Sequence, residues 1–342
     1  MRKVRIGVAG LGRMGRFHAE DIAYRMKDAD LTAVCCRSED RARQMQQELG
    51  ASYAFSSYEE MLDCEELDAV VICTASEKHC EQVIKAIEAG IHVFCEKPLG
   101  LTSKECLTVE EAALENKNIV VQAGFMTRYD MAYRKARGMI AEGRIGRPVY
   151  FRSYRMDAVE HIQSSIDFAV RSGGLFFDVA VHDFDLARWM LDDELVSVYA
   201  MGGCYRYRAF EATSDCDNGI VTMQFRSGAM GTILSGRTCA HGFRVETEII
   251  GTHGTVYIGE GNGQPIVYLY DERGVDIQFA RQFIDRFGAA FLEEKKEFVR
   301  CIQEGTSPEV TVYDAVAATK AAEAADESYK TKDYKMLDDW GN

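Results

Sequence analysis

Apolar residues in the first third of the chain follow the pattern of strands that alternate with helices. Short apolar runs predict strands at residues 4–8, 31–36, 67–74, 91–95 and 119–124. Between these runs, residues 16–27 and 77–89 carry apolar side chains at helical spacing. The run 67–74 (LDAVVICT) is almost continuously apolar, which is typical of a strand that is covered on both faces. This part of the chain therefore predicts a doubly wound parallel sheet.

The rest of the chain is richer in strands than in helices. A strand is expected at 148–156, a polar loop at 157–172 and an amphipathic helix from Leu175 onward. Further strands are predicted at 196–201, 219–225, 230–235, 243–251, 254–258 and 266–270, with helices at 283–298 and 312–329. We place the domain boundary at Gly124. The predicted fold is α/β, with a nucleotide domain at 1–124 and an α+β domain at 125–342 that carries a large, mostly antiparallel open sheet.

Length and composition narrow the class of protein. A chain of 342 residues with 47% hydrophobic residues can bury two cores. The formal charge of −14 argues against nucleic acid and membrane partners, because both are polyanions that attract basic surfaces. A small neutral substrate fits this charge better. No apolar run reaches the roughly 18 residues that span a bilayer.

The 11 cysteines show neither a C-x-x-C pair nor Cys/His spacing typical of a metal site. We therefore expect reduced thiols, a cytoplasmic location and no bound metal.

A glycine motif follows the first predicted strand and precedes the first predicted helix. Gly10, Gly12 and Gly15 fit G-x-G-x-x-G without adjustment. Gly10 permits the tight turn, Gly12 lets the backbone approach a pyrophosphate, and Gly15 lets the helix pack closely on the strand. The free N–H groups at the helix N-terminus then face the anion. The motif predicts a Rossmann dinucleotide site.

The end of the second predicted strand indicates which dinucleotide is bound. Cys36 stands where an NAD enzyme would place a carboxylate on the ribose hydroxyls, and Arg37, Ser38 and Arg41 follow it. Guanidinium and hydroxyl donors suit a 2′-phosphate, so we predict NADP in slight preference to NAD. Alternatively, Arg41 and Arg43 form an ordinary solvated helix face.

Two further turns lie at the carboxyl ends of predicted strands, where open parallel sheets bind ligands. The first contains Thr74 and is followed by His79, which could contact a ligand or serve as a capping or packing histidine. The second contains Lys97, whose backbone is kept extended by the proline that follows it. Lys97 could point into the cofactor crevice or be a surface lysine in a turn.

Asp178 and His182 occur four residues apart in the predicted helix that follows Gly173-Gly174. At this spacing the two side chains lie a turn apart on one side, where a carboxylate can orient or polarise an imidazole. A local hydrogen bond without catalytic function is the alternative.

Residues 90–101 (GIHVFCEKPLGL), taken with the glycine motif, resemble the glucose-fructose oxidoreductase and inositol dehydrogenase (Gfo/Idh/MocA) family, and the resemblance covers nearly all of the chain. It implies that Lys97 touches both the substrate and the nicotinamide ribose and precedes a cis proline. Residues 74–79 are similar to the family's Thr-Pro-x-x-x-His turn, with Ala75 in place of the proline.

Two segments of the second domain also match the family. Residues 124–130 are similar to Gly-Phe-Met-Arg-Arg-Tyr-Asp, which reaches the substrate, with Thr127 at one arginine position. Arg128 at the other could bind sugar hydroxyls or pair with a carboxylate. Gly-Gly-x-x-x-Asp-x-x-x-His is the family's substrate-domain motif, so Asp178, His182 and Lys97 resemble its catalytic trio. Asp157 and His161 are candidates in the loop expected over the active-site mouth.

The expected site residues fall into two groups. Those expected to contact the cofactor are Gly10, Gly12, Arg13, Met14, Gly15, Cys36, Arg37, Ser38, Arg41, Thr74, Ala75, Ser76, His79, Glu96 and Lys97. Those expected to contact the substrate are Lys97, Met126, Arg128, Asp157, His161, Asp178 and His182.

The expected function is reversible NAD(P)-dependent oxidation of a secondary hydroxyl on a cyclic polyol or sugar. His182 would act as the general base, since an ordinary imidazole pKa near ~6.5 suits proton exchange around neutrality. Lys97 would stabilise the developing alkoxide, and Asp178 would position the substrate and His182. The alternatives are a non-catalytic dinucleotide or sugar sensor and an enzyme that retains its cofactor and acts on glycosides. The family associates through its open sheet, so a homodimer or homotetramer is expected.

Overall fold

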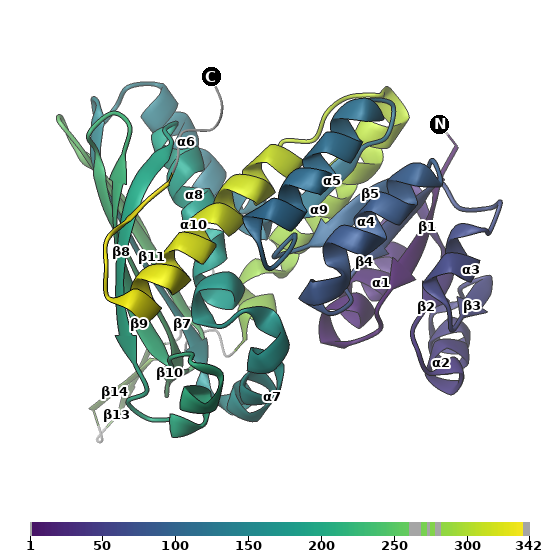
Figure 1. Ribbon diagram of the computed structural model, residues 1–342, viewed down its shortest axis with the longest axis horizontal. Helices are drawn as coiled ribbons and strands as arrows, with labels where there is room; N and C mark the ends of the chain where they lie inside the picture. The colour runs from purple at the N-terminus through teal and green to yellow at the C-terminus, as the bar shows by residue number, and fades with distance from the viewer. Residues whose placement is uncertain (1, 260–267, 272–273, 278–281, 338–342) are drawn as a thin grey trace. The chain divides into compact units, whose positions relative to one another are not determined.

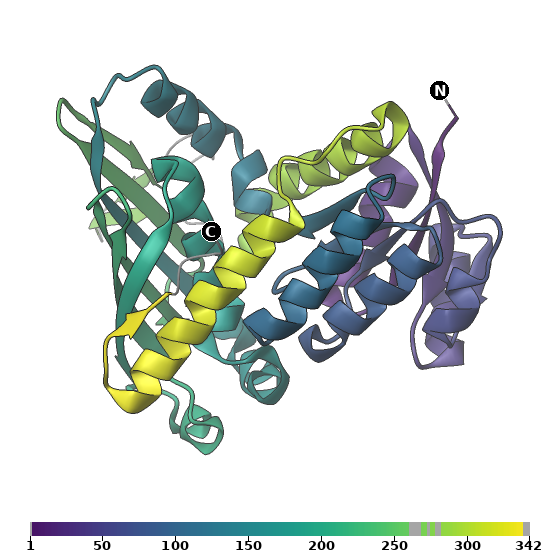
Figure 2. The same cartoon turned by 45° about the horizontal axis from the view of Figure 1, so that its top comes forward.

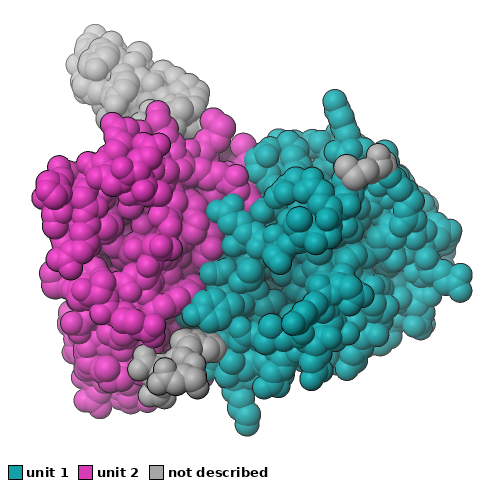
Figure 3. Space-filling view, turned by 90° about the horizontal axis from the view of Figure 1, so that it is seen from above, with its two compact units in different colours: residues 1–126, 291–319 teal, residues 127–290, 320–342 magenta. Residues whose placement is uncertain are grey.

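The computed structural model describes residues 2–259, 268–271, 274–277 and 282–337. Contacts divide the chain into two compact units, which Figure 3 colours separately. Unit 1 comprises Met1–Met126 and Phe291–Thr319, and unit 2 comprises Thr127–Ala290 and Lys320–Asn342. The predicted domain boundary at residue 124 stays a prediction.

Unit 1 is built on a six-stranded parallel sheet with the strand order β3-β2-β1-β4-β5-β6. Its strands are β1 (Val4–Ala9), β2 (Ala29–Cys35), β3 (Tyr53–Phe55), β4 (Ala69–Ile72), β5 (His92–Glu96) and β6 (Val121–Gly124). The chain runs outward from β1 to one edge and returns to β4, so the strand order reverses between β1 and β4. Ligands of open parallel sheets bind beyond the carboxyl ends of the strands at such a reversal. The predicted doubly wound sheet is confirmed.

The helices of unit 1 connect the strands and bury their apolar faces on the sheet (Figure 1). They are α1 (Arg13–Arg25), α2 (Glu39–Leu49), α3 (Tyr58–Leu62), α4 (His79–Glu88) and α5 (Ser103–Glu115), with the 3₁₀ turn η1 (Ser76–Lys78) before α4. Side chains of Ser38, Ser57 and Thr102 cap the N-termini of α2, α3 and α5 by accepting backbone N–H groups. The N-cap of α1 is Gly12, so no side chain covers the first N–H groups of that helix.

Alternation along β1 assigns its residues to two faces. Ile6 and Val8 join one apolar core with residues of α1 and α2 and with residues of α9 (Phe283–Glu304), including Phe298. Gly7 points to the other face, where a Cβ would lie 3.1 Å from the sulfur of Met61. Both faces of the sheet are therefore covered, as the continuous apolar runs predict.

Unit 2 contains a seven-stranded sheet with the order β12-β11-β7-β10-β9-β8-β15. Its strands are β7 (Pro148–Ala158), β8 (Leu195–Gly203), β9 (Asn218–Phe225), β10 (Met230–Cys239), β11 (Arg244–Gly251), β12 (Thr255–Ile258) and β15 (Lys335–Met336). Among the strand pairings that the described residues form in this sheet, β7–β10 is parallel and the others are antiparallel, which confirms the predicted mostly antiparallel sheet. A separate hairpin pairs β13 (Tyr268–Asp271) with β14 (Gly274–Ile277). Positions 266 and 267 of the strand predicted at 266–270 lie outside the described residues.

Helices α6 (Met131–Ala141) and α8 (Val181–Leu191) lie along one face of this sheet, together with the second half of α10 (Val312–Thr331) (Figures 1 and 2). Helices α9 and α10 each contribute residues to both units. No helix within the described ranges combines the length and the apolar character that crossing a membrane requires.

The polar loop predicted at 157–172 is wrong. β7 continues to Ala158, and the rest of the segment is the 3₁₀ turn η3 (Val159–His161) followed by α7 (Ile162–Ser172). Ile162, Ile166 and Ala169 recur at helical spacing between polar neighbours, and Ala169 is buried. The polarity of the segment hid this narrow apolar stripe.

The predicted helix begins at Leu175 as expected, but it is buried on all sides and has no exposed polar face. Its first turn is a π-helix, η4 (Phe176–Ala180), and α8 follows without a break. Every residue of α8 except Trp189 is buried. The buried charges are paired: Asp183 with Arg155, Asp185 with Arg128 and Arg188 with Glu194. Because these partners lie elsewhere in the sequence, local periodicity could not reveal that the polar face is buried.

Candidate functional site

The glycine turn of unit 1 has the geometry of a pyrophosphate cradle. Gly10 has φ +89°, and a Cβ there would lie 2.5 Å from the carbonyl oxygen of Cys73. A Cβ on Gly15 would lie 1.7 Å from the carbonyl oxygen of Gly10, so the helix packs against the turn only because this residue is glycine. A Cβ on Gly12 would meet nothing within 4 Å. Open space over the uncapped N-terminus of α1 fits a bound dinucleotide phosphate. Arg13 and Met14 open α1 beside this space.

The residues at the end of β2 are held by contacts within the protein. Arg41 donates through Nη2 to the carbonyl oxygen of Leu11 at 2.6 Å, so its guanidinium braces the glycine turn. The Ser38 hydroxyl accepts the N–H of Arg41 at 3.4 Å, and Cys36 Sγ donates to the carbonyl oxygen of Ser38 at 3.3 Å. Arg37 is exposed. Contact of these residues with an adenosine ribose stays a prediction.

His79 joins the two turns at the carboxyl ends of β4 and β5. Its side chain is buried, with Nδ1 2.7 Å from the carbonyl oxygen of Pro98 and Nε2 3.2 Å from that of Thr74. Burial lowers the pKa of His79, and a neutral imidazole donates only one N–H. His79 therefore holds the position of the Lys97-Pro98 turn. Thr74 Oγ1 donates to Gln82 Oε1 at 2.5 Å, and Ala75 and Ser76 lead into η1.

Lys97 follows β5 directly and is half-buried. The Lys97–Pro98 peptide bond is cis, as the resemblance implies. The backbone N–H of Lys97 donates to Glu96 Oε2 at 3.2 Å. Glu96 thus fixes the main chain at Lys97, whose amine is expected to be catalytic.

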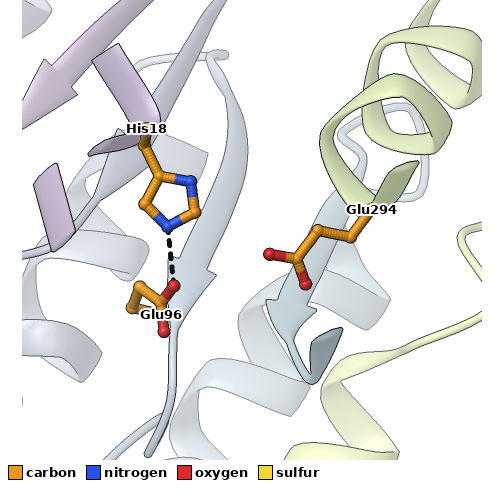
Figure 4. Close-up of side chains that lie close together, drawn as sticks. All are labelled: His18, Glu96 and Glu294. Carbon is orange, nitrogen blue, oxygen red and sulfur yellow. Dashed lines mark hydrogen bonds and ion pairs between the residues drawn. The ribbon is translucent and has the colours of Figure 1, made fainter. Parts of the chain in front are cut away.

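Glu96 belongs to a buried cluster of titratable side chains, shown in Figure 4. His18 Nε2 lies 2.6 Å from Glu96 Oε1, and the carboxylate of Glu294 on α9 points toward this pair. One ligand atom from each of the three residues lies within 4.8 Å of the others. Neither carboxylate oxygen of Glu294 has a hydrogen-bond partner within the described part of the chain.

The cluster holds charged and neutral forms side by side. Burial raises the pKa of Glu294 well above its usual value, the nearby Lys295 opposing this and Glu96 adding to it. Burial also works against ionisation of Glu96, but the hydrogen bond from His18 and nearby positive charge outweigh it and lower its pKa. Burial lowers the pKa of His18. These shifts favour the ionised form of Glu96 and the uncharged forms of Glu294 and His18.

We expect Glu294→Gln to change how stability depends on pH. The folded protein keeps the Glu294 proton well above the pH at which the unfolded chain releases it. The contribution of Glu294 to the free energy of unfolding is greatest below its ordinary pKa of about 4.3. It decreases as pH rises above that value. Tm of wild type minus Tm of Glu294→Gln should therefore decrease between pH 4.5 and pH 8, measured by differential scanning calorimetry. Glu293→Gln, an exposed neighbour on the same helix, is the control and should give a flat difference.

Asp178 and His182 lie in one continuous helical segment of unit 2. Asp178 is in the π-helical turn η4, and its side chain is 21% exposed. His182 is in the first turn of α8 and is 8% exposed. Single π-helical turns inside helices are frequent at functional sites. Arg237 Nη2 lies 3.5 Å from Asp178 Oδ2.

Of the other substrate candidates, the structure gives most detail for Arg128. Its guanidinium donates to both oxygens of Asp185, at 2.9 Å and 2.5 Å, and lies over the ring of Trp189. The carboxylate alternative is therefore the one observed, and a contact of Arg128 with substrate stays a prediction. Asp157 is half-buried near the end of β7, and His161 ends η3. Met126 is buried at the end of the first segment of unit 1.

The structure thus brings the expected residues together in two groups. The cofactor candidates of unit 1 lie in the glycine turn and at the carboxyl ends of β2, β4 and β5, where Lys97 is also found. Arg128, Asp157, His161, Asp178 and His182 belong to unit 2.

Three buried charged residues near these groups were missed from the sequence. Arg237 continues the inward-facing positions Ile233 and Ser235 of β10, but the predicted strand stopped too early to include it. Glu294 falls on the apolar stripe of α9 between Phe291 and Phe298, which is a signal that the sequence contained. Asp215 lies before β9, without a local pattern to mark it.

The fold and the site residues define a two-domain, dinucleotide-dependent oxidoreductase. The family model described as "Oxidoreductase family, NAD-binding Rossmann fold" matches residues 4–125, and the model described as "GFO/IDH/MocA C-terminal domain" matches residues 133–257. The chain belongs to the Gfo/Idh/MocA oxidoreductase family, which confirms the resemblance.

Relatives match over nearly the whole chain. The scyllo-inositol 2-dehydrogenase (NAD(+)) of Bacillus subtilis is 34% identical, over 96% of this chain and 94% of the relative. The myo-inositol 2-dehydrogenase of Thermotoga maritima is 32% identical, over 96% and 97%. A crystal structure of scyllo-inositol dehydrogenase from Lactobacillus casei, with bound NAD(H) and scyllo-inositol, is 34% identical, has a TM-score of 0.93 and covers 98% of this chain and 99% of that one. These comparisons do not support the preference for NADP.

Proposed function

We propose that this protein is an NAD-dependent dehydrogenase that reversibly oxidises a secondary ring hydroxyl of an inositol. The 34% identity with the scyllo-inositol 2-dehydrogenase (NAD(+)) over 96% of the chain carries this proposal. The open cradle over Gly12 and the three residues at the family's catalytic positions, Lys97, Asp178 and His182, support it. Thr127 occupies one arginine position of the family's motif, so an arginine there cannot contribute to substrate binding in this chain.

Each catalytic residue has a chemical task in this proposal. An alcohol proton is too weakly acidic to leave unaided, so His182 takes it as the general base. Lys97 donates a charged hydrogen bond to the oxygen as its negative charge develops. Asp178 positions the substrate and His182. The nicotinamide, when bound, supplies the acceptor for the hydride of the carbinol carbon.

The choice of NAD rests on the arginines that follow β2. Arg41 donates to the carbonyl oxygen of Leu11, and Arg43 pairs with Glu39 at 2.6 Å. Both guanidinium groups therefore have partners within the protein, and Arg43 lies on a solvated helix face. Arg43 thus matches the alternative of a solvated helix face, while Arg41 braces the glycine turn. The bound NAD(H) of the Lactobacillus casei enzyme also supports NAD.

We also propose that the protein forms a dimer or tetramer through the open face of the unit 2 sheet. Met201, Met230 and Tyr257, from β8, β10 and β12, are 47%, 58% and 50% exposed. Strand register places the three side chains on the same face. Light scattering after size-exclusion chromatography tests the assembly, and Met230→Glu should shift it toward the monomer.

A substrate panel tests the proposed activity. Scyllo-inositol, myo-inositol, glucose, galactose, sugar acids and glycosides are each incubated with NAD and NADP, and reduced nicotinamide is followed by its absorbance. We expect an inositol with NAD to give the highest kcat/KM, at least tenfold above the same inositol with NADP. If no polyol is oxidised although NAD binds, a sensor replaces the proposal. Nicotinamide in the purified protein without net turnover would instead indicate a retained cofactor.

A further inference from the structure

Arg237 is a buried cation on β10 of the unit 2 sheet. The residue is 1% exposed, and it faces the helical side of the sheet in the same register as Ile233 and Ser235. A buried charge is costly unless it is paired and hydrogen-bonded. The partners of this guanidinium therefore indicate what it does.

Asp215 is the tight partner of Arg237. Nη1 of Arg237 lies 2.7 Å from Asp215 Oδ2, and the guanidinium carbon lies 4.6 Å from the ring centre of Phe210. Nη1 also donates to the carbonyl oxygen of Cys216 at 3.4 Å. These contacts fix the position of the guanidinium.

Asp215 also fixes the start of the helix that carries Asp178. Its Oδ1 accepts the N–H of Leu175 at 2.8 Å. Gly174 has φ +90°, and a Cβ there would lie 2.8 Å from the same oxygen. The carboxylate therefore reaches the backbone only because residue 174 is glycine. One carboxylate orients both the guanidinium and the first turn of the helical segment.

Asp178 is the loose partner of the same guanidinium. Its Oδ2 lies 3.5 Å from Arg237 Nη2, beyond the 2.7–2.9 Å that is typical of a strong charge-assisted hydrogen bond. The Asp178 side chain is 21% exposed, whereas that of Asp215 is 6% exposed. Asp178 thus interacts electrostatically with Arg237 and is less buried than Asp215.

The charge of Arg237 persists in this environment. Burial acts against it, but Asp215 and then Asp178 outweigh burial and raise the pKa of Arg237 above its usual value. Titratable groups that interact with Arg237, Asp215 or their neighbours lie on the surrounding elements: Asp157 on β7, Cys204, Cys216 and Asp217 before β9, and Asp326 and Tyr329 on α10. His182 on α8 lies one turn along the helix from Asp178.

We propose that Arg237, anchored by Asp215, is a positioning residue for the dehydrogenase reaction. It compensates the negative charge of the Asp178 carboxylate and directs the side chain, so that Asp178 can hold the substrate hydroxyl and the base in place. This inference rests on the proposed function, in which Asp178 positions substrate and His182. Arg237 acts through Asp178 and need not touch the substrate itself.

The test compares Arg237→Met and Arg237→Lys with wild type in NAD-dependent oxidation of the best inositol across pH. We expect Arg237→Met to lower kcat/KM by roughly 10- to 100-fold and to move the acid limb of the pH profile to higher pH. Protonation of the base, His182, sets this limb, and an Asp178 carboxylate without its compensating cation favours the protonated imidazole. Affinity for NAD, measured by fluorescence, should not change. Lysine restores a point charge without the planar fork, so Arg237→Lys should recover part of the rate and most of the acid limb.

Arg155→Met is the matched control. Arg155 on β7 is also buried, and it pairs with Asp183 of α8 at 2.7 Å rather than with Asp178. Its loss should lower Tm as the loss of Arg237 does but leave the acid limb in place. An unshifted acid limb in both Arg237 variants would overturn the inference, as would an equal shift in Arg155→Met. If wild type oxidises no polyol, the proposed function fails and this inference fails with it. That result is seen in wild type alone, so it can be distinguished from an unshifted acid limb in the Arg237 variants and from an equal shift in Arg155→Met.

Discussion

Lys97→Met should lower kcat/KM for inositol oxidation by about 10²- to 10³-fold, the usual effect of removing a donor that stabilises developing negative charge. The side chain follows β5 at the carboxyl edge of the parallel sheet, and its backbone is held by Glu96 and by the turn that His79 fixes. Methionine keeps the length of the side chain but removes the charge. Steady-state kinetics with NAD at several inositol concentrations measures the loss.

A separate measurement distinguishes chemistry from cofactor binding at Lys97. NADH fluorescence titration should give a Kd within a fewfold of wild type, because the glycine turn provides the phosphate cradle independently of the amine. Lys104→Met is the control, since Lys104 is an exposed lysine in the next helix, α5. Retention of more than about half of the wild-type kcat/KM in Lys97→Met would remove the amine from the reaction.

The second large effect is expected at His182. His182→Ala should lower kcat by about 10²- to 10⁴-fold, because a positioned general base contributes a factor of this size. NAD affinity should be retained, since His182 belongs to unit 2 and the phosphate cradle belongs to unit 1. The residual rate should rise with pH as hydroxide replaces the missing base, and added imidazole should restore part of it.

His253→Ala provides the comparison for His182→Ala. His253 is an exposed histidine in the turn between β11 and β12, and its loss should leave kcat unchanged. A His182→Ala variant that turns over at nearly the wild-type rate would show that another group takes the proton.

Much of the fold was predictable because its determinants are local. Continuous apolar runs such as residues 67–74 indicate buried parallel strands, and Gly10, Gly12 and Gly15 indicate the turn by their spacing alone. The antiparallel sheet of unit 2 was predicted from strand-like runs that are separated by glycine-containing turns. In each case, the signal lies within a dozen residues of the element that it specifies.

What could not be predicted depends on partners distant in sequence. Asp183 and Asp185 lie in the helix that was predicted to be amphipathic. Only their ion pairs with Arg155 and Arg128, each on another element, explain how they are buried. The link from Asp215 to Leu175 spans 40 residues. Long-range ion pairs of this kind leave no local periodicity, so the positioning network around Asp178 was invisible in the sequence.

The cofactor preference shows the same limit. Cys36 in place of a carboxylate, followed by guanidinium and hydroxyl donors, favoured a 2′-phosphate, but the sequence does not show where a guanidinium points. Arg41 turns to the carbonyl oxygen of Leu11, and Arg43 turns to Glu39. The sequence shows that Arg41 and Arg43 follow the second strand. Their contacts within the protein, which the sequence does not show, are what weaken the case for NADP.

The central claim is that Lys97 and His182 act on the same hydroxyl in one chemical step. A double-mutant cycle in kcat/KM with Lys97→Met, His182→Ala and the combined variant tests it most directly. Residues that act as a unit are strongly non-additive, so the combined variant should be slowed about as much as the slower single variant. Losses that multiply fully in the combined variant would show that the two side chains act independently and would contradict the account.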